Sequence, residues 1–154
     1  MRKSKYLVLS LFYFKFDTKL SKIIEINELF KNQNILDLFR FDNLKNIKEN
    51  QFEYYNLNFI YLPQNIEIIK NYAFDNNQIK ILDLSNCIKL KNIGNCAFEE
   101  NPLKKIKILN NIKIIYGDYN KIDDWNNFIK YYDDNGKKSG DYKLENNQWQ
   151  WYPL

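Results

Sequence analysis

Residues 66–101 read IEIIKNYAFDNNQIKILDLSNCIKLKNIGNCAFEEN, and this stretch contains one pattern twice. Phe74 and Phe98 are each preceded by one of the chain's only two alanines, and Phe52 extends the series, with separations of 22 and 24 residues. Aliphatic residues keep this spacing in other registers: Leu44, Ile66, Leu90 and Ile112; Ile47, Ile69, Ile93 and, 22 residues on, Ile115; Leu57, Ile79 and Leu103; Ile60, Leu82 and Ile106. Self-similarity with a period of about 20 to 50 residues is typical of a solenoid.

The second unit reads Ile66-x-x-Ile69-x-x-x-Ala73-Phe74-x-x-Asn77, and the third reads Leu90-x-x-Ile93-Gly94-x-x-Ala97-Phe98-x-x-Asn101. On these residues the chain resembles the BspA-like (treponemal-type) leucine-rich repeat, and Leu62-Pro63 fits the turn of that family. The resemblance covers about residues 35–120. It departs where Gln51 replaces alanine and where Tyr119-Asn120 replaces Ala-Phe.

We therefore predict an α/β fold, a short leucine-rich-repeat solenoid of about four units of 22–24 residues. Its parallel strands are expected near residues 36–38, 59–62, 81–84 and 105–108. Because a solenoid needs atypical end units, residues 1–34 are predicted to form an N-terminal cap and residues 121–154 a C-terminal cap around repeats at 35–120. The chain is expected to form one compact domain.

The N-terminal region has two interpretations. Residues 6–14 form an apolar run after the basic residues Arg2, Lys3 and Lys5, as in an export signal. The run is short, however, and no Ala-x-Ala follows it, so it also fits a buried first strand of the cap. It is too short to span a bilayer. A helix is expected within residues 18–32.

The C-terminal region predicts a helix followed by a β-hairpin. Asp123 or Asp124 can cap a helix whose apolar residues share one face, and Asn135-Gly136 can end it. That face comprises Trp125, Phe128, Ile129 and Tyr132. Tyr142 and Leu144 then alternate, Asn146-Asn147 predicts a turn, and Trp149 and Trp151 alternate back.

Composition argues against an enzyme. The chain has no histidine, which excludes Ser-His-Asp and Cys-His sites and imidazole metal ligands. Its two cysteines, Cys87 and Cys96, cannot alone make an ordinary structural zinc site; they are expected to be free thiols, or a disulfide if the protein is exported. The acidic pairs stand at element ends, and Lys137-Lys138 lacks the spacing of a phosphate-binding loop. We predict no catalytic residues, no metal and no cofactor.

Alternation within the predicted strands separates a core row from an exposed row, since successive side chains point to opposite faces. The exposed residues are expected to form a ladder across the sheet. We predict this ladder as the ligand-binding face, because exposed aromatics beside charges suit a partner; isolated exposed apolar residues can also mean nothing. The face comprises Asp37, Phe59, Tyr61, Ile81, Asp83, Lys105 and Lys107. Asn77 and Asn101, which match in register, are instead expected to bond the backbone where the coil turns.

These observations favour a non-enzymatic module that binds a protein ligand. The resemblance implies a secreted or cell-surface protein, whereas an intracellular scaffold follows if residues 1–15 are not an export signal. The net charge of +4 comes from dispersed lysines, so a nucleic-acid partner is not expected. The chain is expected to be monomeric and to have no transmembrane span.

Overall fold

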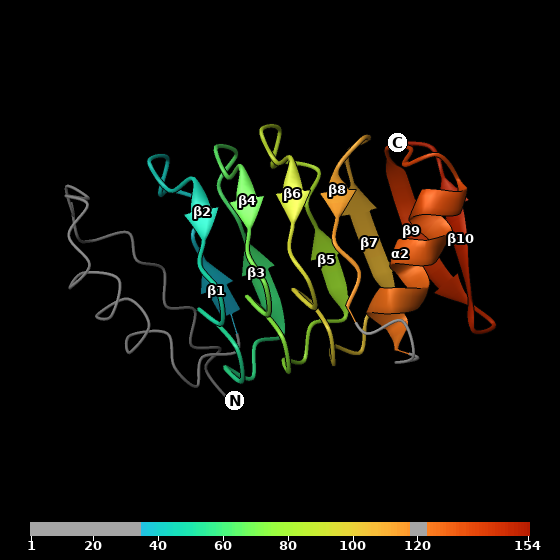
Figure 1. The fold of residues 1–154 in the computed structure, drawn as a ribbon, viewed down its shortest axis with the longest axis horizontal. Helices are drawn as coiled ribbons and strands as arrows, with labels where there is room; N and C mark the ends of the chain where they lie inside the picture. The colour runs from blue at the N-terminus through green and yellow to red at the C-terminus, as the bar shows by residue number, and fades with distance from the viewer. Residues whose placement is uncertain (1–34, 118–122) are drawn as a thin grey trace, which may run out of the picture.

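The computed structural model describes residues 35–117 and 123–154, and it contains two stacks of parallel strands (Figure 1). The first stack holds β1 (Ile35–Asp37), β3 (Phe59–Tyr61), β5 (Ile81–Asp83) and β7 (Lys105–Ile108). The second holds β2 (Asn46–Ile47), β4 (Ile68–Ile69), β6 (Asn92–Ile93) and β8 (Lys113–Ile114). Each coil contributes one strand to each stack, so the predicted short solenoid is confirmed. The strand and helix predicted before residue 35 lie outside the described residues.

The core follows from the repeat spacing. Ile47, Ile69 and Ile93 stand side by side in the second sheet, where β2 pairs with β4 and β4 with β6. Between the sheets, the rings of Phe52, Phe74 and Phe98 are stacked, with centroids 5.4 and 5.2 Å apart. Trp125 ends this row, 5.1 Å from Phe98. All four aromatic residues are fully buried, so the period of 22 to 24 residues is the length of chain that returns a phenylalanine to the same place.

Each coil also turns through two left-handed residues. Asn50, Tyr72 and Cys96 have positive φ in one register. Tyr54, Asn76 and Glu100 have positive φ in another, four residues further on. The buried asparagines Asn77 and Asn101 are not in this conformation, and their contribution is hydrogen bonding to the backbone, as predicted.

One predicted register is wrong in the last coil. Ile115, which stands 22 residues after Ile93, is 46% exposed. Ile93 instead pairs with Ile114, which is buried. The last coil reaches the second sheet one residue earlier, and a shift of one residue turns the next side chain to the opposite face.

The C-terminal helix and hairpin are confirmed. In α2 (Asp124–Asp134), Asp123 Oδ1 accepts a hydrogen bond from the N–H of Asn126, at 2.7 Å, and caps the helix. The four residues of the predicted apolar face are all buried. After Asn135 and Gly136, β9 (Gly140–Glu145) and β10 (Gln148–Tyr152) form the antiparallel hairpin.

The hairpin extends the sheet formed by β5 and β7. β9 pairs antiparallel with β7, on the edge of β7 that faces away from β5. The strand order is therefore β10-β9-β7-β5. α2 lies against the inner face of this extension, where Phe128 contacts Tyr142 and Trp149 at centroid distances of 5.3 and 5.4 Å (Figure 1). The helix and hairpin thus close this end of the core with aromatic side chains.

Candidate interaction surface

The first stack, which consists of the β1–β3 sheet and the adjoining β5–β7 strands, presents two rows of outward side chains. Leu36, Ile60, Leu82 and Ile106 occupy the middle of their strands and are buried, so the residues on either side of each point outward. Strand register places Ile35 beside Phe59 and Asp37 beside Tyr61. On the next pair of strands, it places Ile81 beside Lys105 and Asp83 beside Lys107. The structure therefore brings all seven predicted face residues onto the same side of two adjoining sheets, β1-β3 and β5-β7-β9-β10.

An apolar cluster lies at the centre of these rows. Phe59, Tyr61 and Ile81 are 44%, 52% and 48% exposed. They stand on β3 and β5, which lie side by side where the β1–β3 sheet meets the sheet that runs from β5 to β10 (Figure 1). Scattered exposed apolar side chains are ordinary on a protein surface, but three large ones on adjacent strands form a contiguous patch.

Two aspartates border the patch and are held in place by turns. Asp37 Oδ1 accepts a hydrogen bond from the N–H of Phe39, at 3.0 Å. Asp83 Oδ1 accepts from the N–H of Ser85 at 3.0 Å and from its hydroxyl at 2.6 Å. Each carboxylate therefore has a structural role at the end of its strand besides any contact with a partner.

The basic side of the surface extends further than the sequence indicated. Lys105 stands opposite Lys143 on β9, and its Nζ lies 3.1 Å from Asp141 Oδ2. Lys107 stands opposite Asp141. Sequence reasoning missed Asp141 and Lys143. Their alternation with Tyr142 was the available signal that they face outward, but nothing in the sequence indicated that β9 pairs with β7.

The family model of the BspA type leucine rich repeat region matches residues 10–120, in six copies. This range covers well over half of the chain. The chain belongs to the BspA-type leucine-rich repeat family. No curated protein and no solved structure matches it.

This BspA-type repeat protein has both thiols buried in its described part. Cys87 and Cys96 are not joined in a disulfide, and each is less than 5% exposed. Burial, with a smaller contribution from Asp83, raises the pKa of Cys87 to about 12. Cys96, which the sequence did not mark as a core position, occupies one of the left-handed turn positions. The equivalent turn residues Asn50 and Tyr72 are exposed and half-buried, so the turn alone does not bury Cys96; Gly117 of the last coil lies against its Sγ.

Acidic side chains of successive coils also meet beside the phenylalanine row. Asp75 is 6% exposed and Glu99 is 5% exposed. Burial raises the pKa of Asp75, and the neighbouring carboxylates Glu99 and Glu53 raise it further, against the lowering effect of hydrogen bonds from Asn76. Within residues 35–117 and 123–154, no group of three or more histidine, cysteine or acidic residues is placed to hold a metal ion.

The described helical part of the chain consists of α2, which has 11 residues. No helix in the described ranges is long and apolar enough to cross a membrane. Membership of the family indicates a repeat module of the kind that mediates protein interactions, a class that is typically non-enzymatic.

Proposed function

We propose that this protein is a non-enzymatic interaction module that binds a protein ligand on the exposed face of β1, β3, β5 and β7. The observation that carries the proposal is the contiguous patch of Phe59, Tyr61 and Ile81, each close to half exposed. Apolar and aromatic side chains supply most of the free energy at the centre of protein interfaces. Charged residues at the rim, here Asp37, Asp83 and Lys107, set orientation and specificity.

The rigidity of the backbone supports the same function. The outward side chains belong to short strands whose inward neighbours are completely buried or nearly so. A surface built on such strands loses little conformational freedom when it binds, which favours affinity. We further propose that the protein acts at the cell surface or after secretion; an intracellular scaffold is the alternative, in which the solenoid only holds other elements together.

The test is site-specific photo-crosslinking in the cells that make the protein. A photo-crosslinking amino acid placed at position 61 should capture a protein partner. The same residue at position 46, which is exposed on the second sheet, is the matched control and should not capture it. Equal capture from both positions would contradict the proposed face.

A second measurement separates protein from nucleic-acid binding. Binding of the captured partner should survive a rise in salt and should be lost in the double variant Phe59→Ser and Tyr61→Ser. A steep salt dependence with a nucleic acid as ligand would favour the basic residues instead. Since both aromatic residues are about half exposed, the double variant should keep the unfolding midpoint of the wild type.

Location is tested independently. Loss of roughly the first 15 to 20 residues, together with sensitivity of whole cells to protease shaving, would support export. A full-length, protected protein in the soluble fraction would support the intracellular scaffold.

A further inference from the structure

The strand β10 is the last of its sheet. In the part of the chain that the structure describes, its backbone pairs with β9 on one side only. No other strand of the described ranges pairs with the second edge of this five-residue strand. An open edge presents a row of backbone donors and acceptors that another strand can pair with.

The hairpin turn determines which residues face that edge. Asn146 and Asn147 form a two-residue turn with φ of 49° and 61°, and Glu145 stands opposite Gln148. In such a hairpin the residues flanking the turn bond to each other, and bonded pairs then alternate with non-bonded ones. Gln150 is therefore bonded to β9, whereas Trp149 and Trp151 direct their backbone N–H and C=O groups to the open edge.

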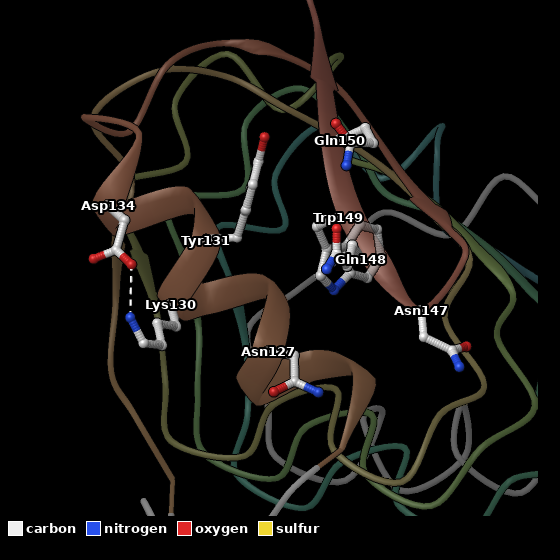
Figure 2. Close-up of a pocket in the computed structure, with 8 residues that line it drawn as sticks. All are labelled: Asn127, Lys130, Tyr131, Asp134, Asn147, Gln148, Trp149 and Gln150. Carbon is white, nitrogen blue, oxygen red and sulfur yellow. Dashed lines mark hydrogen bonds and ion pairs between the residues drawn. The ribbon is translucent and has the colours of Figure 1, made fainter.

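A groove runs beside this edge, between α2 and β10 (Figure 2). Its volume is about 440 Å³. The residues that line it are mostly amides and aromatics: Asn127, Lys130, Tyr131, Asp134, Asn147, Gln148, Trp149 and Gln150. The lining has one positive and one negative group, Lys130 and Asp134, which pair with each other at 2.7 Å, so the groove has no excess of either charge.

The sequence of β10, QWQWY, does nothing to protect the edge. Natural proteins usually protect an open edge with lysine, with proline or with an inward charge. β10 contains none of these, and Pro153 comes only after the strand has ended. The outward side chains Gln148 and Gln150 are exposed amides, which both donate and accept hydrogen bonds and so can pair with copies of themselves.

We propose that two copies of this chain associate through antiparallel pairing of β10 with β10 of a second copy, around a twofold axis at Gln150. In this register Trp149 lies opposite Trp151 of the second copy, and the backbone groups that face the open edge bond to each other. Gln150 lies opposite Gln150 of the second copy in a non-bonded pair, where side chains approach most closely. A neutral, amide-rich surface is self-complementary under a twofold axis, whereas a charged peptide would find no opposite charge here.

The consequence is one continuous sheet through both copies. Because a twofold axis perpendicular to the sheet keeps the same side outward, the two Phe59–Tyr61–Ile81 patches would face the same way. The dimer would present its binding face twice, and a ligand with two sites would gain apparent affinity from the second contact. The dimer itself does not depend on the function proposed for that face. It is the alternative to the monomer that the sequence analysis expects.

The test uses charges at the axis. Light scattering coupled to size-exclusion chromatography should show a dimer for the wild-type chain, with dissociation on dilution. Gln150→Glu and Gln150→Lys should each be monomeric at the same concentration, because like charges would then oppose each other across the axis. An equimolar mixture of the two variants should recover the dimer. The matched control, Gln78→Glu, changes an exposed residue away from β10 and should remain dimeric.

Several outcomes would overturn the proposal. They are a wild-type chain that stays monomeric up to about millimolar concentration, charge variants that remain dimeric, a mixture that fails to recover the dimer, or dissociation of the Gln78→Glu control. Circular dichroism of each variant shows whether it is folded. If a Gln150 variant does not fold, Gln148→Lys is tested in its place. Gln148 lies opposite Tyr152 of the second copy, so this substitution should weaken the dimer without disturbing the core.

Discussion

The side-chain oxygen of Asn101 accepts a hydrogen bond from the backbone N–H of Ile79, one coil earlier, at 3.0 Å. The nitrogen of the same amide donates to the backbone oxygens of Phe74, Phe98 and Glu99, at 2.9 to 3.1 Å. A single side chain, 5% exposed, therefore satisfies backbone groups of two successive coils. Buried backbone groups without partners are costly, so this asparagine is what allows the chain to leave the phenylalanine turn and enter the next strand.

Replacing Asn101 with alanine should destabilise the protein by at least about 3 kcal/mol, because several buried backbone groups lose their partner at once. The free energy of unfolding in urea measures the effect. Asn86→Ala, at an exposed turn position, is the control and should change stability by less than about 0.5 kcal/mol. A loss below about 1 kcal/mol for Asn101→Ala would mean that water replaces the amide.

The phenylalanine row gives a second prediction. Phe74 lies between Phe52 and Phe98 and is fully buried. Phe74→Ala should cost about 3 to 5 kcal/mol, and Phe74→Leu should cost less because it leaves a smaller cavity. Thermal and urea unfolding check both. Phe59→Ala removes the same ring from the exposed face and should have little effect; a large loss there would show that the inside and outside rows have been exchanged.

The sequence predicted the repeated part of the fold because the repeat reports the core directly. Leu36, Ile60 and Leu82 alternate with outward neighbours in units of 24 and 22 residues, and only a stacked arrangement buries them all. The helix face that contains Trp125 and Tyr132 could be predicted for the same reason, because the spacing of its apolar residues reports the buried side. The seven face residues followed from alternation alone, and the structure places them together; whether they bind a partner is the proposal to be tested.

Other features had no local signal. Left-handed turn positions usually carry glycine or asparagine, but here Tyr54, Tyr72 and Glu100 occupy three of them, so they could be recognised only after alignment to the fold. The alternation of Trp149 and Trp151 predicted the hairpin. Its pairing with β7 could not be predicted, because an amphipathic hairpin can either pack on a core or extend a sheet. The one-residue shift at Ile114 likewise depends on the path of the last coil.

Asp75 predicts a stabilising substitution. Its Oδ2 accepts from Asn76 at 2.9 Å, but its buried Oδ1 has no hydrogen-bond partner within the described residues. Burial raises the pKa of this carboxyl, so the folded protein binds the proton more tightly than the unfolded chain. Asp75→Asn should therefore stabilise the protein at pH 7, by roughly 1 kcal/mol.

The stability gained from Asp75→Asn should depend on pH. As pH falls through the raised pKa of Asp75, the wild type gains the proton and the cost of the buried charge disappears, so the advantage of Asp75→Asn should shrink. Urea unfolding at pH 7 and near pH 4 measures the difference. Asp42→Asn, at an exposed position, should be neutral at both. An advantage that stays constant with pH would show that the buried charge is not its origin.

Cys87 predicts the behaviour at alkaline pH. Its side chain is 1% exposed, and burial raises its pKa from 9.0 to about 12; burial likewise raises the pKa of Tyr132 to about 12. At a pH between the ordinary pKa of each group and its raised pKa in the folded protein, the unfolded chain releases a proton that the folded protein retains. The stability contributed by the neutral groups is complete below about pH 9 and is lost as pH rises towards 12, so the free energy of unfolding should fall over that window.

The rate at which Cys87 reacts with a thiol reagent at pH 8 also reports its burial, because the thiolate is the reactive form. In a Cys96→Ser variant, which leaves Cys87 as the chain's single thiol, Ellman's reagent at pH 8 should react slowly with the folded protein and fully in denaturant. Cys87→Ala should fall less steeply in stability between pH 9 and 11 than the wild type, since one of the two titrating groups named above is gone. Rapid reaction of the folded Cys96→Ser variant would contradict the burial of Cys87, and an unchanged alkaline slope would assign the pH dependence to the tyrosines.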